Sequence, residues 1–580
     1  METIIIYNIS DLIPYAESLK AEPLLAVDTE TTGLNPHIHK IRLIQLAWKD
    51  KILIIDCFSF LPEGYTIIKE ILESKSLKIF QNAKFDLQFF MAMNILPPNI
   101  FDTMIAAQIL APLGGPKKFN LGELSRYYLN EEMDKELQKS DWSRHLTEDQ
   151  IRYAGKDAAV LLKLYKVLTG QIYEKGLMDI ARIEFSCIFS VTQMEYYGIL
   201  LDIDSWKHLT EQMEEEKIAA IAQLNQFTDS PAYTQMTLWG DEEIVNNNFD
   251  SNTYLLSLLH KHQIDVENTS KSTLAPYRDN PLVMAVSRYR SASKLLSAFL
   301  HPMEQMVNPK TGRIHPRYGQ ISAYSGRMSC YSPNIQQIPR SQEFRRCFMA
   351  PEGRKLLIAD YSQIELRVMA QITEDRRMLE AYKNGEDLHR LTASFMLNKP
   401  VEEVDKEERQ YAKAVNFGLI YAMGASGLCQ YALQSYGVEM TLEQAERFRK
   451  LFFEAYPGVK HWHNELLKNH QEMTQGQTLS GRKFLLPQWY GLPAFSNTPV
   501  QGTAADILKK ALGDLAYQLK GTDAYIIATV HDEILMECPE EKVDYYAEML
   551  KNTMIQASDS ILTNVPAEVE VSIGNTWAEK

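Results

Sequence analysis

Closely spaced cysteine pairs are absent from this 580-residue sequence. Its six cysteines are scattered along the chain, and no two of them form a C-x-x-C pair. This spacing indicates neither a zinc site nor a disulfide framework. It is typical of a protein from a reducing compartment. The six are Cys57, Cys187, Cys330, Cys347, Cys429 and Cys538.

Long apolar runs are also missing. No stretch approaches the roughly 20 apolar residues that a membrane-spanning helix needs. The N-terminal segment, METIIIYNISDL, has no basic region and only a short apolar stretch, which argues against a signal peptide. With 45% hydrophobic and 23% charged residues, the composition is that of an ordinary globular protein. We therefore expect a cytoplasmic protein without membrane contact, and a viral or organellar origin stays open.

Positive charge is scarce, because 60 Lys and Arg stand against 75 Asp and Glu and give a net charge of −15. Residues 285–346 are the exception, with ten cations and two acids, so this stretch carries +8 and the remainder −23. A basic belt on an acidic body favours binding of a polyanion. A solvated charged face is the alternative, although such a face normally mixes in acids. The ten are Arg288, Arg290, Lys294, Lys310, Arg313, Arg317, Arg327, Arg340, Arg345 and Arg346.

Acidic residues end two apolar runs that are typical of buried strands. KLLIADY (355–361) leads into Asp360, and AYIIATVHDEILMEC (524–538) predicts a hairpin with acids at its tip. A carboxylate at the end of a buried strand is costly unless a cation compensates it. Asp360 alone would be explained as a turn cap. Two such carboxylates brought together are what a two-metal phosphoryl-transfer site requires.

The first third of the sequence alternates strand-like and helical runs and places more acids on them. Asp28 and Glu30 are two apart on an extended segment, so both side chains project to one face. Asp86 opens a helical run, and Tyr153 and Asp157 are four apart on one side of a helix. Taken alone, a D-x-E pattern would indicate only a polar strand end. We expect strands at 3–7, 24–29, 41–48 and 51–56 and helices at 66–75 and 83–93.

Three motifs resemble those of a known family. DYSQIELR (360–367), RQYAKAVNFGLIY (409–421) and VHDE (530–533) resemble, in this order, the polymerase motifs of the family A DNA polymerases of the bacterial DNA polymerase I type. The D-x-E, N-x-x-x-D and Y-x-x-x-D patterns resemble the DEDD-type 3′–5′ exonucleases in their tyrosine form. The resemblance implies a template-directed DNA polymerase with a proofreading exonuclease.

The family's fold implies a domain order. An α/β exonuclease domain of the ribonuclease H-like, DEDD type is expected to precede an α+β palm–fingers–thumb hand. No 5′-nuclease domain precedes residue 1, so we expect the large-fragment part of such an enzyme, natural or trimmed. The expected limits are 1–178 for the exonuclease, 179–371 for the first palm part with the thumb at about 203–300, 372–487 for the fingers, and 488–580 for the second palm part.

The resemblance implies Mg²⁺ in both sites, two ions in each, with Mn²⁺ able to replace it. The expected polymerase ligands are Asp360, Asp532 and the backbone of Tyr361, while Glu533 and His531 are expected to support the primer terminus. In the exonuclease, the resemblance assigns the two ions to Asp28, Glu30, Asp86 and Asp157, and assigns Tyr153 to orienting the attacking water.

The second motif predicts a helix whose capping box is formed by Asp405 and Glu408. One stripe of this helix runs from cations to aromatics; without the flanking motifs it would be an amphipathic surface helix. By resemblance Lys413, Arg409 and His389 bind the triphosphate, and Phe417 faces sugar and base. Glu365 and Tyr421 are expected to exclude a ribose 2′-hydroxyl, and Gln363 is a further substrate-binding residue. The expected DNA contacts are Arg327, Asn334, Gln337, Asn497, Gln501, Arg288, Arg290 and Lys294.

The expected partners are primer–template DNA and deoxynucleoside triphosphates, bound by a nucleoid-associated monomer whose accessory proteins the sequence does not identify. Two positions depart from the family pattern: Ala422 stands where a glycine is typical, and Pro493 where many members carry an arginine. Two other functions stay open. One is a nuclease whose polymerase half has decayed, and the other is a non-catalytic DNA-binding scaffold.

Overall fold

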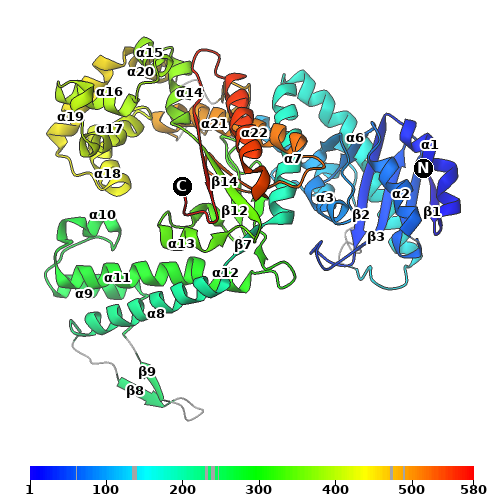
Figure 1. The fold of residues 1–580 in the computed structure, drawn as a ribbon, viewed down its shortest axis with the longest axis horizontal. Coiled ribbons are helices and arrows are strands. Elements are labelled where there is room, and N and C mark those ends of the chain that lie inside the picture. The colour runs from blue at the N-terminus through cyan, green and yellow to red at the C-terminus, as the bar shows by residue number, and fades with distance from the viewer. Residues whose placement is uncertain are drawn as a thin grey trace.

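The computed structural model describes residues 1–60, 62–133, 140–228, 233–236, 242–245, 247–469, 475–487 and 490–580. The chain forms an α/β unit at one end and a hand-like arrangement of three further parts at the other (Figure 1). No helix in these described ranges is long and apolar enough to cross a membrane.

The N-terminal unit is built on a six-stranded sheet of order β1-β4-β3-β2-β5-β6. Only β3 runs antiparallel to its two neighbours, and the other three pairings are parallel. The four expected strands form within two residues of their predicted ends. The elements are β1 (Glu2–Ile6), α1 (Ile9–Ala21), β2 (Leu24–Thr31), β3 (Ile41–Trp48), β4 (Lys51–Asp56), α2 (Pro62–Leu72), β5 (Leu77–Phe80), α3 (Ala83–Ala92), β6 (Ile100–Asp102), α4 (Thr103–Leu110), α5 (Leu121–Leu124) and α6 (Glu148–Glu174).

Helix α6 crosses the sheet and carries the last acidic motif of this unit. It begins with a capping box, in which the Thr147 side chain accepts from the backbone N–H of Gln150 and the Gln150 side chain accepts from that of Thr147. Its buried face, which includes Ala154, Ala158 and Leu161, packs on the sheet core. Tyr153 and Asp157, one turn apart on the same helix, are only partly buried.

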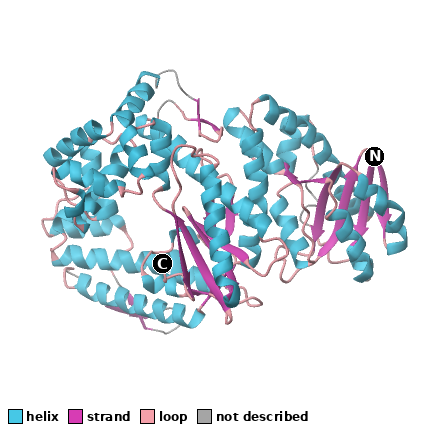
Figure 2. Cartoon of the chain, turned by 45° about the horizontal axis from the view of Figure 1, so that its top comes forward, coloured by secondary structure: helices cyan, strands magenta, loops and turns pink. Residues whose placement is uncertain are grey.

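Helix α7 (Met178–Tyr197) joins the two halves of the molecule. Its residues Ile180 and Ile188 belong to the core of the N-terminal unit, whereas Val191 and Met194 belong to the core of the palm. Since one helix contributes to both cores, the halves share a packed junction. Figure 2 shows the sheet of each half with helices between them.

The palm is centred on a four-stranded antiparallel sheet of order β17-β18-β14-β19. The long helix α21 packs against α7, α14 and α22. The palm elements are β7 (Ile199–Leu201), α12 (His301–Gln305), β10 (Arg313–Ile314), β11 (Arg317–Gly319), β12 (Ser329–Tyr331), α13 (Gln342–Arg346), β13 (Phe348–Met349), β14 (Arg354–Tyr361), α21 (Leu492–Gln518), β17 (Tyr525–Val530), β18 (Glu533–Pro539), α22 (Val543–Asp559) and β19 (Val569–Gly574).

Two helical regions extend from the palm, one above and one below it in Figure 1. The thumb has its own core and comprises α8 (Ile203–Asn225), β8 (Tyr233–Met236), β9 (Glu242–Val245), α9 (Asn252–Lys261), α10 (Lys271–Leu274) and α11 (Pro281–Leu295). The fingers comprise α14 (Ile364–Thr373), α15 (Arg376–Lys383), α16 (Leu388–Leu397), α17 (Lys406–Leu419), α18 (Ala425–Tyr436), α19 (Leu442–Ala455), α20 (Pro457–Asn469), β15 (Gln475–Gln477) and β16 (Lys483–Leu485).

A buried ionic cluster connects α7, α21 and the β15–β16 hairpin. The Glu184 carboxylate on α7 accepts from Lys509 Nζ at 2.5 Å and from the Arg482 guanidinium. Arg482 Nε also donates to Asp506 Oδ1 at 2.8 Å. All four side chains are buried, so removal of one partner would leave an uncompensated charge. The cluster therefore fixes the hairpin and the palm helix relative to the junction.

Candidate active sites

Strand register brings the acids of the first and third motifs together. β14 and β18 are antiparallel, and Asp360 lies directly opposite Glu533. The predicted hairpin forms as β17 and β18, joined by His531 and Asp532, with His531 in the left-handed region at φ 60°. The Tyr361 N–H donates to the Asp532 carbonyl at 3.4 Å. Residues about 170 positions apart in sequence thus form one acidic edge.

The electrostatics of this edge favour a bound cation. Burial, with the nearby Asp360 carboxylate, raises the pKa of Asp532 to about 7. Asp360 Oδ1 is buried, and none of the residues that the structure describes donates a hydrogen bond to it. A buried carboxylate oxygen without a donor is costly, and a divalent cation would compensate it. The residues present therefore fit a divalent metal.

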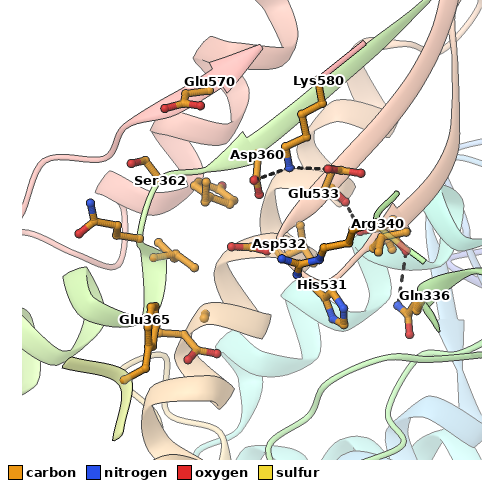
Figure 3. Close-up of a pocket in the computed structure, with 18 of the residues that line it drawn as sticks. Gln336, Arg340, Asp360, Ser362, Glu365, His531, Asp532, Glu533, Glu570 and Lys580 are labelled. Atoms are coloured by element: carbon orange, nitrogen blue, oxygen red, sulfur yellow. Dashed lines mark hydrogen bonds and ion pairs between the residues drawn. The ribbon is translucent and has the colours of Figure 1, made fainter. Parts of the chain in front are cut away.

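Sequence reasoning missed a cation at this edge, Lys580. Its Nζ lies 2.5 Å from Asp360 Oδ2 and 2.6 Å from Glu533 Oε2 (Figure 3). Glu533 Oε1 also accepts from the indole N–H of Trp577 at 2.6 Å. A lone lysine near the end of a sequence carries no local pattern, so no sequence signal could have identified it.

Helix α17 presents the cations of the second motif. Its predicted capping box, Asp405 with Glu408, is confirmed. Arg409 Nε donates to Asp387 Oδ2 at 2.6 Å, and Asp387 also caps α16. Burial, with the charge of Arg409, lowers the pKa of Lys413. The Asp387 contact was missed, although an acid just before a helical run is a recognisable cap signal.

His389 is held in a defined orientation beside these cations. It is buried, and its Nδ1 accepts from the Asn416 side-chain amide at 2.9 Å. Burial lowers the pKa of His389 to about 3, so the ring is neutral at pH 7. With Nδ1 accepting, Nε2 carries the proton, and Nε2 has no partner within the described part of the chain. A free N–H donor therefore lies at the cavity wall.

Glu365 is shared by two side chains from different elements. It lies in the first turn of α14 and accepts hydrogen bonds from the Tyr421 hydroxyl and the Arg327 guanidinium. The predicted helical stripe ends before Tyr421, because α17 stops at Leu419 and Tyr421 follows it in a turn. The placement of Tyr421 on the motif helix was therefore wrong, although its side chain still reaches Glu365.

Most of these side chains line one open cavity of about 1070 Å³. Figure 3 shows part of its lining, with acids from β14 and the β17–β18 turn on one side. Eight of the expected residues do not line it: Tyr421, Asn334, Gln337, Asn497, Gln501, Arg288, Arg290 and Lys294. The expected residues that line it are Asp360, Tyr361, Gln363, Glu365, Arg327, His389, Arg409, Lys413, Phe417, His531, Asp532 and Glu533. Gln336 and Arg340, which sequence reasoning did not select as contacts, line it too.

The basic belt is partly neutralised from outside its own segment. Arg288 on α11 makes two hydrogen bonds with Glu216 on α8, at 2.6 and 2.8 Å, and Arg290 donates to Asn252. Arg313 pairs with Glu537 at 2.6 Å. Lys294 is exposed, and no acid in the described ranges lies within ion-pair distance of it. The inference that the belt lacks interspersed acids therefore fails in three dimensions for Arg288 and Arg313.

The acids of the N-terminal unit meet at the sheet edge next to α6. Asp28 and Glu30 come from β2, Asp86 from the first turn of α3, and Asp157 from α6. Asp86 Oδ1 accepts from the Thr29 hydroxyl at 2.6 Å. As the side chains stand, no three or more His, Cys, Asp or Glu in the described ranges surround one metal position.

These carboxylates nevertheless repel one another strongly. Burial, followed by the charge of Asp157 and Asp86, raises the pKa of Glu30 to about 9. Burial, with the charge of Asp86 first among its neighbours, raises the pKa of Asp28. Divalent cations would relieve both effects, so the donor set fits metal binding.

Tyr153 lies beside this group. Its hydroxyl hydrogen-bonds Asp157, and burial together with that carboxylate raises the pKa of the Tyr153 phenol. The phenol is therefore protonated at neutral pH and is available as a donor.

Comparisons with known proteins agree with this arrangement. The family model described as DNA polymerase family A matches residues 207–579, and the one described as 3′–5′ exonuclease matches residues 3–173. DNA polymerase I of Aquifex aeolicus is 34% identical over 97% of each chain. That of Pseudomonas aeruginosa is 30% identical over 97% of this chain, which spans 64% of the longer relative.

A solved structure gives the same fold. The POL domain of Pol1 from M. smegmatis, in complex with a DNA primer–template and dNTP, superposes with a TM-score of 0.84 over 98% of both chains, at 23% identity. On the family matches and the relatives, this chain belongs to the family A DNA polymerases and is a DNA-directed DNA polymerase with a 3′–5′ exonuclease domain.

Proposed function

We propose that Asp360 and Asp532 hold the divalent cations of the polymerase site, with the Tyr361 carbonyl as a further ligand. The proposal rests on two features of one edge of the cavity. Asp360 Oδ1 is buried and accepts no hydrogen bond from the described residues, and the pKa of the neighbouring Asp532 is raised. Two Mg²⁺ ions, replaceable by Mn²⁺, would supply Lewis-acid stabilisation of the charge that develops during phosphoryl transfer.

The cations of the fingers bind and orient the nucleoside triphosphate. Arg409 and Lys413 provide positive charge on one face of α17, and Asp387 holds the Arg409 guanidinium in place. His389 Nε2–H donates to a phosphate oxygen, an interaction that needs no change of protonation. Phe417 lies beside His389, with ring centroids 5.7 Å apart, and packs against the sugar and base. Gln363, which lines the same cavity, is a further substrate-binding residue.

The DNA occupies the cavity formed by palm and fingers and extends beyond it toward the thumb. Arg327, Asn334, Gln337, Asn497 and Gln501 contact primer and template, and His531 with Glu533 supports the primer terminus. Arg288, Arg290 and Lys294 on the thumb contact phosphates. The substrates are primer–template DNA and deoxynucleoside triphosphates, which the M. smegmatis complex also contains. The proposed enzyme acts as a monomer.

The exonuclease site holds its own pair of divalent cations. Asp28, Glu30, Asp86 and Asp157 are the ligands, and the Tyr153 hydroxyl orients the attacking water. The raised pKa values of Asp28 and Glu30, caused by burial and then by the charges of neighbouring carboxylates, support these ligands.

The same reasoning divides the chain into an exonuclease domain at 1–178, a palm at 179–371 and 488–580, a thumb at about 203–300, and fingers at 372–487. The separate cores of the exonuclease unit and of the thumb support these two units, whereas palm and fingers share one core.

Primer extension on a gel tests the two site assignments separately. Asp28→Ala with Glu30→Ala should abolish shortening of the primer without dNTPs and leave extension near the parental rate. Asp532→Ala should abolish extension and leave shortening of a frayed end. Shortening by the first variant, or parental extension by the second, would refute that site's assignment. Shortening without any extension by the parental chain would favour the decayed-polymerase alternative, and neither activity would favour the scaffold.

A further inference from the structure

The last residues of the sequence, 574–580, fold back against the palm beside its carboxylates. Trp577 is fully buried, and its backbone N–H donates to the Phe348 carbonyl at 2.9 Å. Its indole N–H donates to Glu533, and the Arg345 guanidinium lies 4.4 Å from the ring centre. These contacts fix the position from which the next residues enter the cavity.

Lys580 is held by a short turn in this segment. The Glu579 carboxylate accepts from the backbone N–H groups of Asn575 and Thr576, both at 3.1 Å. Beyond this turn the Lys580 ammonium lies between Asp360 and Glu533, as Figure 3 shows. Two adjacent carboxylates attract the positive charge of this ammonium and so stabilise it in this position.

The two carboxylates depend on Lys580 to different degrees. Glu533 also accepts from Trp577 and has Arg345 at 3.7 Å. Among the described residues, Lys580 is the one cation within ion-pair distance of Asp360. Without the Lys580 contact, the negative charge of Glu533 would still be compensated, whereas that of Asp360 would not.

We propose that Lys580 is an internal counter-cation of the polymerase site, which neutralises Asp360 before a divalent cation binds and is exchanged for that cation. The inference rests on the proposed role of Asp360 as a metal ligand. Lys580 keeps its contact with Glu533 after the exchange, since that carboxylate is not released. Because an incoming ion must displace the ammonium, the free enzyme binds divalent cations more weakly than its carboxylates alone would.

Mn²⁺ binding to the full chain, measured by electron paramagnetic resonance without DNA or nucleotide, tests the proposal. The background carries Asp28→Ala and Glu30→Ala, so that the polymerase site dominates binding. Lys580→Met should bind Mn²⁺ roughly tenfold more tightly, within the usual range of couplings between adjacent sites. Lys580→Arg, which keeps the charge, should retain the parental affinity.

Lys542→Met is the matched control, because Lys542 forms a 2.6 Å ion pair with Asp523 elsewhere on the palm. It should leave Mn²⁺ binding unchanged. Unchanged or weaker binding by Lys580→Met would overturn the counter-cation role. Asp360→Asn separates this result from the proposed metal site: if that variant binds Mn²⁺ like the parent, the ligand assignment itself is wrong.

Folding of the Lys580 variants is checked in the chain with an intact exonuclease, since shortening of single-stranded DNA uses a different unit. If Lys580→Met does not retain that activity, Lys580→Gln replaces it. The expected tightening and the overturning result are the same for both substitutions.

Discussion

The Tyr421 hydroxyl donates a hydrogen bond to the Glu365 carboxylate, and the two residues are 56 positions apart in the sequence. Glu365 starts α14, and Tyr421 follows the end of α17. Arg327 donates to the same carboxylate from the palm. A carboxylate held by two donors has a fixed position, which is what exclusion of one sugar hydroxyl requires.

Glu365→Ala should relax the exclusion of ribonucleotides by about tenfold or more, because a fixed obstacle is removed from the cavity wall. Tyr421→Phe should have a smaller effect, since Glu365 keeps its Arg327 contact. Competition between dNTP and rNTP in single-nucleotide incorporation measures both. Tyr456→Phe, which removes a hydroxyl buried against Thr392, is the control and should not change the ratio. Parental discrimination by Glu365→Ala would contradict the assignment.

The exonuclease carboxylates should make metal-free stability depend on pH. The pKa of Glu30 is about 9 in the folded chain against 4.5 ordinarily, so folding takes up a proton between these values. Its contribution is therefore fully present below about pH 4 and is lost as pH rises toward 9. Mg²⁺ favours the ionised form, so the rise in Tm that Mg²⁺ produces over EDTA should be larger at pH 9 than at pH 6.

Calorimetry of the parental chain and of Asp28→Asn with Glu30→Gln isolates this effect. The neutral variant should lose most of the pH dependence that the exonuclease site contributes. A Mg²⁺ shift that is equal at both pH values, in both proteins, would show that these carboxylates are not coupled to metal binding.

Ala422 should tolerate glycine with a gain in stability. Its φ is 58°, in the left-handed region, and its N–H donates to the Leu419 carbonyl at 3.1 Å in the turn after α17. A residue with a Cβ pays about 1 kcal/mol there, so Ala422→Gly should raise the free energy of unfolding by up to that amount. Denaturant unfolding measures it. The control is Ala547→Gly inside α22, which should lower stability by about 1 kcal/mol.

Lys294 should contribute more to the salt dependence of DNA binding than Arg288. Each cation that neutralises a phosphate adds about 0.9 to the negative slope of log affinity against log salt. Lys294→Ala should therefore flatten the slope by roughly one unit for every DNA sequence. Arg288 is occupied by Glu216, so Arg288→Ala should change the slope less. Salt titrations of both variants, with the exposed palm residue Lys551→Ala as control, decide this. A parental slope for Lys294→Ala would place the phosphate contacts elsewhere.

The sequence by itself determined the local features of this protein. Alternating and continuous apolar runs located four of the six strands of the first sheet and the palm hairpin, and the spacing of Asp405 and Glu408 located the start of α17. Asp360 and Asp532 were selected as candidate metal ligands because an uncompensated charge at the end of a buried strand is costly. Each of these features depends on residues that are neighbours in the chain.

The tertiary structure alone decided which charges compensate one another. Lys580 and Asp360 are 220 residues apart, and Arg288 and Glu216 are 72 apart. Their pairing depends on how the tail and the thumb helices pack, and no local pattern encodes that packing. The end of α17 before Tyr421 also depends on tertiary contacts. The Tyr421 side chain is only 7% exposed, and its hydroxyl donates to Glu365 on another helix. Charge pairing and side-chain burial are properties of the assembled fold, whereas strand and cap signals are properties of short segments.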